Sequence, residues 1–180
     1  MEIRLLHESD WQGLYDLVEH VDKKMVGMLG EPHDLVEDWV NSIELGVWEV
    51  YVAILPHLDI KKEQDRIVRK LLPWKRIIDN GSGIVGLVSL YGDYEEEEEL
   101  EKGEFDIGIT VASPFQKRGI GRQLLDFIIQ RGKELGYDTA TFSTRMDNLP
   151  MQKLAKKFDF EYRRKYTKQG YTWLNFSKKI

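Results

Sequence analysis

The segment from residue 105 to residue 135 constrains the fold more than any other part of the chain. Residues 105–111 alternate apolar and polar side chains, which is typical of a strand with one buried face. Residues 119–135 place apolar side chains at helical spacing, and Gly136 follows where glycine commonly ends a helix. A strand, a short glycine-containing loop and an amphipathic helix in this order predict a mixed α/β domain around one sheet.

Other periodic segments complete this domain. Strands are expected over 2–6, 74–78, 84–90, 139–143, 160–166 and 171–176, with an Asp79-Asn80-Gly81 turn that makes a hairpin of the second and third. Helices are expected after a capping box at Ser9 and Gln12, over 35–43 and 60–72, and after Asn148, which is followed by Pro150. Residues 47–55 fit a strand and a buried helix equally well. We therefore expect one domain over 1–180, with an atypical helical segment around 22–72.

Composition excludes several classes of protein. Apolar residues make up 42% of the chain and charged residues 32%, which suits a globular domain with a charged surface. The net charge of −5, from 26 basic and 31 acidic side chains, argues against a nucleic-acid partner. Cysteine is absent, the four histidines have no ligand spacing, and no apolar run approaches the ~18 residues of a membrane helix. The first residues carry no signal-peptide pattern, so we expect a cytoplasmic protein. Because cysteine and histidine ligand spacing are both missing, we expect no metal site.

The loop between this strand and helix is a candidate anion site. Amides at a helix start lack intrahelical acceptors, and the helix dipole favours negative charge there. Gly119 and Gly121 allow a phosphate to approach the backbone, and Lys117, Arg118 and Arg122 supply positive charge. Taken alone, Gly-x-Gly fits equally well a turn before a helix with exposed basic residues. A P-loop is excluded because its Lys-Ser/Thr ending is missing, and the third glycine of the dinucleotide fingerprint is missing too.

Two motifs resemble those of the GNAT N-acetyltransferase superfamily. Its phosphate loop, Gln/Arg-x-x-Gly-x-Gly/Ala, matches residues 116–121, Gln-Lys-Arg-Gly-Ile-Gly. Its second pattern, an asparagine followed by a short helix, matches Asn148 to Phe160, and here it resembles protein-lysine acetyltransferases of the superfamily. The resemblance covers 74–180 well and 1–21 plausibly, whereas 22–72 does not clearly match. It implies the GNAT-type acyl-CoA N-acyltransferase fold, a twisted mixed sheet of about seven strands flanked by helices.

The resemblance also implies a cofactor and its contacts. Acetyl-CoA would bind between the strands 105–111 and 139–143, which splay apart in this superfamily, and coenzyme A would leave as product. Backbone groups of the first strand would pair with the pantetheine arm, amides of the loop would hold the pyrophosphate, and an asparagine would contact the arm. The residues expected to bind the cofactor are Ile109, Thr110, Val111, Gln116, Lys117, Arg118, Gly119, Ile120, Gly121, Arg122 and Asn148.

The implied reaction is direct transfer of the acetyl group to a primary amine. The amine must lose a proton before it attacks, because its solution pKa is ~10.4 for a lysine-type amine. We expect Glu104 to be the general base, with Asp106, on the same strand face, in reserve; Glu104 can equally be an edge residue of an acidic loop. In many relatives a tyrosine acts as the general acid at the position where this chain has Ala155, so the general acid is not assigned. Three tyrosines of the closing hairpin, Tyr162, Tyr166 and Tyr171, are more readily explained as packing residues.

Partners follow from this expectation. The acceptor is an amine-bearing small molecule or a protein, through a lysine or an N-terminus, and neither nucleic acid nor a membrane is expected. The acidic run 95–99 fits a solvated hairpin tip and, alternatively, a surface that attracts a cationic acceptor. The closing hairpin offers an edge through which a homodimer can form. Two rival hypotheses stay open: a non-catalytic acyl-CoA-binding module of the same fold, and an interaction protein that has lost the cofactor.

Overall fold

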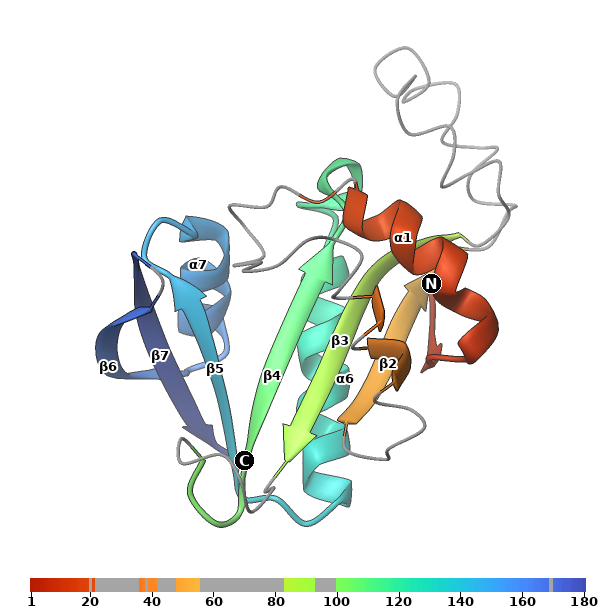
Figure 1. The fold of residues 1–180 in the computed structure, drawn as a ribbon. Coiled ribbons are helices and arrows are strands. Elements are labelled where there is room, and N and C mark those ends of the chain that lie inside the picture. Colours follow the sequence, from red (N-terminus) through yellow and green to blue (C-terminus); the bar gives the residue numbers. More distant parts are fainter. Residues whose placement is uncertain are drawn as a thin grey trace.

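A seven-stranded mixed sheet forms the centre of the protein (Figure 1). The structure, a computed structural model, describes residues 1–19, 21, 36–37, 39–41, 48–55, 83–92, 100–168 and 170–180. The strands are β1 (Glu2–Leu5), β2 (Trp48–Ile54), β3 (Ile84–Gly92), β4 (Glu104–Val111), β5 (Thr139–Arg145), β6 (Glu161–Lys168) and β7 (Tyr171–Lys179). Their spatial order is β1-β2-β3-β4-β5-β7-β6. Every neighbouring pair is antiparallel except β4 and β5, which are parallel.

Helices cover both faces of the sheet. Figure 1 shows α1 (Trp11–Glu19) in front of the sheet and α6 (Ile120–Glu134) behind it. The last helix, α7 (Leu149–Lys157), follows β5 and precedes the closing hairpin β6–β7. The predicted fold class, a mixed sheet of seven strands flanked by helices, is confirmed. Between helices and sheet lies a continuous hydrophobic core that runs from Leu6 to Phe160 along the chain.

The N-terminal helix begins differently from the prediction. The capping box consists of His7 and Asp10, not of Ser9 and Gln12, and it opens a short 3-10 turn over Glu8–Asp10 that leads into α1. His7 accepts from the Ser9 amide, and Asp10 also binds Arg4 through both carboxylate oxygens at 2.7 and 2.8 Å. Trp11, the first residue of α1, is 52% exposed.

The expected helical segment around 22–72 contains a strand. Residues 48–54 form β2 with a run of buried side chains, which decides between the two structures that the sequence allowed. Residues 36–37 and 39–41 are helical as predicted, and Val36 and Trp39 are buried. Strand β3 is paired on one edge with β2 and on the other with β4, so its partners differ from the predicted hairpin. The expected strand 74–78, the turn at 79–81 and the helix over 60–72 lie outside the described residues.

Close packing fixes α6 against the strand that precedes it. Phe105 is fully buried in β4, and a Cβ added to Gly132 of α6 would overlap its ring. The absence of a side chain at Gly132 therefore sets how near helix and strand approach.

Replacing Gly132 with Ala should lower the free energy of unfolding by about 1–3 kcal/mol, because overpacking outweighs the gain in helix propensity. Chemical denaturation of the purified variant measures the change. A variant as stable as the wild type would show that the helix moves away from β4 at no cost.

An ion pair links α6 to strand β2 of the sheet. Arg131 donates to both carboxylate oxygens of Glu49 on β2, at 2.7 and 2.8 Å, and Tyr51 donates to the same carboxylate at 2.7 Å. Arg131 lowers the pKa of Glu49 below its ordinary value, and burial beside this carboxylate raises the pKa of Tyr51 to about 12.

Because the pKa of Glu49 is depressed in the folded state, its contribution to stability is complete above the ordinary glutamate pKa of about 4.3 and disappears as the pH falls through the folded value. Glu49→Gln should therefore lose about 1 kcal/mol of stability at pH 7 and become equal to the wild type in acid. Urea unfolding across this range measures both limits. A difference that persists in acid would mean that packing, and not charge, carries the effect.

Candidate active site in the cleft between β4 and β5

Strands β4 and β5 pair over three positions and then part. The register joins Glu104 to Thr139, Phe105 to Ala140 and Asp106 to Thr141, and no β4 residue after Asp106 is paired with β5. Figure 1 shows the two strands diverging toward the end of β4 from which the chain enters α6. A cleft lies at this opening, lined by Val21, Ile109, Thr110, Val111, Gln116, Lys117, Gly121, Asn148, Pro150, Met151 and Leu154.

The end of β4 presents backbone groups to this cleft. The amide of Ala112 donates to Val85 on β3, and the peptide groups of successive residues point to opposite edges of a strand. The N–H and C=O of Ile109 and the N–H of Val111 therefore face β5 and the cleft. By the same alternation, Thr110 directs its peptide group to β3, opposite Leu87.

Thr110 contributes its side chain instead. It lines the cleft although it is only 6% exposed. Within the described part of the chain, its hydroxyl has no hydrogen-bond partner. A buried hydroxyl without a partner carries a desolvation cost, which a polar ligand in the cleft would remove.

The predicted anion loop lies at the top of the cleft. Gly119 is the N-cap of α6 with φ +86°, and no side chain of the described residues caps the helix. The first intrahelical bond that begins there is from Gln123 to Gly119, so the amides of the three residues between them have no intrahelical acceptor. Gln116 ties the loop to β4 by donating to the Val111 carbonyl at 3.0 Å, and Lys117 adopts φ +61°, which is uncommon outside glycine.

The three cations expected around this loop have different neighbours. Lys117 lines the cleft. Arg118 is exposed and lies over the ring of Phe115, 5.7 Å from its centre, whereas Arg122 is 3.8 Å from Asp126 one turn further along α6. Ile120 is buried in the core, so only its backbone can serve a ligand.

The far wall of the cleft comes from α7. Asn148 is buried and accepts from the amide of Met151 at 3.2 Å, so the predicted cap is present and lies at the cleft. Ala155, at the position where many relatives have a tyrosine, is completely buried in the core.

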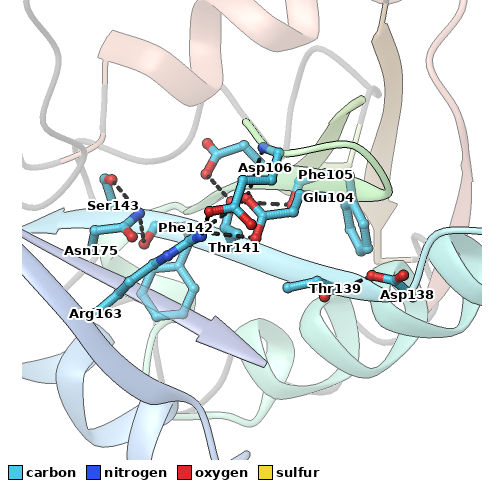
Figure 2. Close-up of polar contacts among 11 residues, drawn as sticks. Glu104, Phe105, Asp106, Asp138, Thr139, Thr141, Phe142, Ser143, Arg163 and Asn175 are labelled. Carbon is cyan, nitrogen blue, oxygen red and sulfur yellow. Dashed lines mark hydrogen bonds and ion pairs between the residues drawn. The ribbon is translucent and has the colours of Figure 1, made fainter. Parts of the chain in front are cut away.

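The predicted base Glu104 is buried in an ion pair. Arg163 of β6 donates to both of its carboxylate oxygens at 2.9 Å, and the amide of Glu101 donates to one of them at 3.1 Å (Figure 2). Arg163 also contacts the carboxylate of Glu101 at 2.6 Å. This partner was missed by sequence reasoning because Arg163 is far from β4 in the chain and no pattern singles it out.

Asp106 lies where the two strands part. It belongs to the last pair of the β4–β5 register and is half-buried, and the hydroxyl of Thr141 donates to its carboxylate at 3.0 Å. The alternation of β4 places Asp106 and Glu104 on one face, opposite α6.

The three tyrosines of the closing hairpin make packing contacts. Tyr162 meets Phe176, Tyr166 stacks on Trp173, and Tyr171 lies under the guanidinium of Arg145 at 4.0 Å from the ring centre. None of the three lines the cleft.

Metal ligands and membrane-spanning helices bear on the class of site. Among the described residues, no group of three or more His, Asp or Glu side chains is placed to hold a metal ion. No helix in the described ranges has the length and apolar character needed to cross a membrane.

Solved structures with the same fold come from several bacteria. A ribosomal-protein-alanine N-acetyltransferase from Brucella melitensis is 19% identical, covers 100% of both chains and has a TM-score of 0.70. A ribosomal-protein-S5-alanine acetyltransferase from Vibrio fischeri is 13% identical, with 98% of this chain and 91% of that chain covered and a TM-score of 0.70. A putative acetyltransferase from Salmonella typhimurium, solved with acetyl-CoA, is 15% identical over 99% and 93% of the chains, with a TM-score of 0.67. At these identities the likeness establishes the fold.

A match to a sequence family establishes more than the fold. Residues 34–160 match the acetyltransferase (GNAT) family, so the match includes β4, the loop and α7 and extends into the stretch 22–72, which the motifs alone had left unmatched. Since this match spans most of the chain, the protein is a member of the acetyltransferase (GNAT) family.

Proposed function

We propose that this protein moves an acetyl group from acetyl-CoA to a primary amine by direct attack. The observation that carries the proposal is a single cleft that combines outward-facing backbone groups of a parting strand with the uncapped start of a long helix. The first suits an amide-bearing arm, and the second suits a phosphate. Acetyl-CoA contains both.

The pantetheine arm would lie along the end of β4. Its amides would pair with the N–H and C=O of Ile109 and the N–H of Val111, as a neighbouring strand would. The hydroxyl of Thr110, buried without a partner in the described part of the chain, would donate to or accept from the arm. Asn148 would contact the arm from the opposite wall.

The pyrophosphate would bind at the start of α6. Amides of residues 119–122 would donate to its oxygens, and Lys117, which lines the cleft, would supply positive charge. A Cβ at Gly121 would meet protein atoms only at ordinary distances, 3.8 Å from Val111 and 4.0 Å from Leu154. The fold therefore does not require glycine there, which supports a ligand as the reason for it.

Asp106 is our candidate for the general base. A base must reach the acceptor's proton, and the point where the strands part is where an acetyl group at the end of the arm would lie. Asp106 is half-buried at that point, whereas both oxygens of Glu104 are held by Arg163. We therefore give the proton transfer to Asp106 and a supporting role to Glu104.

The acceptor is a lysine side chain, an N-terminus or a small amine. Two structures of the same fold are named as ribosomal-protein-alanine acetyltransferases, which makes an N-terminal alanine peptide one acceptor to test. The second candidate function is acyl-CoA binding without catalysis, and the buried Ala155 in place of a tyrosine favours it. Acetyl-CoA binding with no turnover over a broad panel of amines and peptides would decide for that second function.

Asp106→Asn should lower kcat/KM at pH 7 by about 10²-fold or more, because an amide cannot accept the acceptor's proton. The affinity for acetyl-CoA, measured by calorimetry, should stay close to that of the wild type. Unchanged turnover would exclude Asp106 as the base.

Gly121→Ala should weaken acetyl-CoA binding by at least about 10-fold, since a Cβ intrudes between the pyrophosphate and the helix amides, while raising stability by up to about 1 kcal/mol. The matched control is Gly132→Ala in the same helix, for which the opposite pattern of stability is expected. Full affinity in Gly121→Ala would contradict the placement of the pyrophosphate.

A further inference from the structure

Arg163 owes its direction to an irregularity in β6. The register of the closing hairpin pairs Tyr162 with Phe176 and Arg164 with Asn175, so Arg163 is an extra residue with no partner position on β7. An extra residue of this kind forms a β-bulge, which bends the strand and redirects a side chain.

The redirected side chain bridges the two strands that separate β6 from β4. Strand β6 is the edge strand, and β7 and β5 lie between it and β4. The guanidinium of Arg163 nevertheless reaches Glu104, the first residue of β4, with 2.9 Å contacts to both carboxylate oxygens, as Figure 2 shows. The carboxylates of Glu104 and Glu101 raise the pKa of Arg163, which fixes its positive charge.

The pair matters because of where Glu104 lies. Its side chain is 6% exposed, and a buried carboxylate without a partner is strongly unfavourable. Asp106 is two residues further along the same strand face, roughly 7 Å away by the strand rise. Two carboxylates at this separation oppose each other's ionisation unless a cation neutralises one of them.

We propose that Arg163 is a positioning residue: by balancing the negative charge of Glu104, it lowers the cost of a second negative charge on Asp106, which proton transfer to Asp106 requires. The inference rests on the proposed function only for the use made of that proton. It assigns the bulge of β6 a role in a reaction at β4, which is separated from β6 by two strands.

Other described groups also lie near Asp106. Among the described residues, the titratable and hydrogen-bonding groups on this face are Glu101 from the preceding turn, Tyr91 opposite Asp106 on β3, Thr141 on β5 and the buried Asp16 on α1. Arg163 contacts two carboxylates at the start of β4, those of Glu101 and Glu104. Its removal changes the charge balance directly.

The test is a titration of the Asp106 side chain by carbon-detected NMR of the cofactor-free protein, with Asp106→Asn to assign the resonance. In Arg163→Met, the unpaired Glu104 should raise the titration midpoint of Asp106 by about one pH unit. In Glu104→Gln, the unpaired Arg163 should lower it by a similar amount. The double variant should return to the wild-type midpoint, and Arg164→Met, one residue along β6, should leave it unchanged.

Opposite shifts that cancel are expected only from charge. Shifts of the same sign in the two single variants, or a midpoint that none of them moves, would overturn the proposal. If Arg163→Met does not fold, Glu104→Gln and the double variant still decide: the midpoint must fall in the first and recover in the second.

Kinetics separates this inference from the function itself. With an active acceptor, the acidic limb of kcat/KM against pH should move with the Asp106 midpoint in each variant. A limb that stays fixed while turnover continues overturns the inference and leaves the acetyltransferase intact. Shifts in the NMR titration with no turnover of any amine would support the charge linkage and contradict the proposed function.

Discussion

The separation of β4 from β5 is the constraint on which the rest of the structure depends. Two parallel neighbours in a sheet normally satisfy each other's backbone groups along their whole length, yet here the pairing ends at Asp106 and Thr141. Beyond that point, β4 offers hydrogen-bonding groups that no strand of the described residues receives. A ligand with amides at strand spacing is the natural partner, and the uncapped start of α6 lies where its charged end would be.

The surrounding contacts keep this opening in a fixed shape. On one face of the sheet, Gly132 allows α6 to lie directly on Phe105, and Arg131 holds the helix to β2 through Glu49. On the opposite face, Arg163 links the start of β4 to the outermost strand. Helix, sheet edge and cleft are thus linked by close packing and by charge.

Local sequence patterns predicted the elements that build the cleft. The alternation of residues 105–111, the two glycines of the loop and the asparagine cap of α7 each depend on neighbours in the chain, and each is present. The structure of residues 47–55 and the partners of β3 were harder to predict because tertiary contacts decide them. The pairing of Arg163 with Glu104 depends on a bulge, which has no sequence signature here, and it moved the role of base to Asp106 in our proposal.

In our proposal, β4 and the start of α6 bind acetyl-CoA as one site. Amide chemical shifts and hydrogen exchange of the labelled protein, followed during a titration with acetyl-CoA, test it most directly. We expect slower exchange at the amides of Ile109 and Val111, large shifts at residues 119–122, and little change at the amide of Thr110, which faces β3. Saturating acetyl-CoA that leaves these amides unaffected, or that perturbs a different surface, would contradict it.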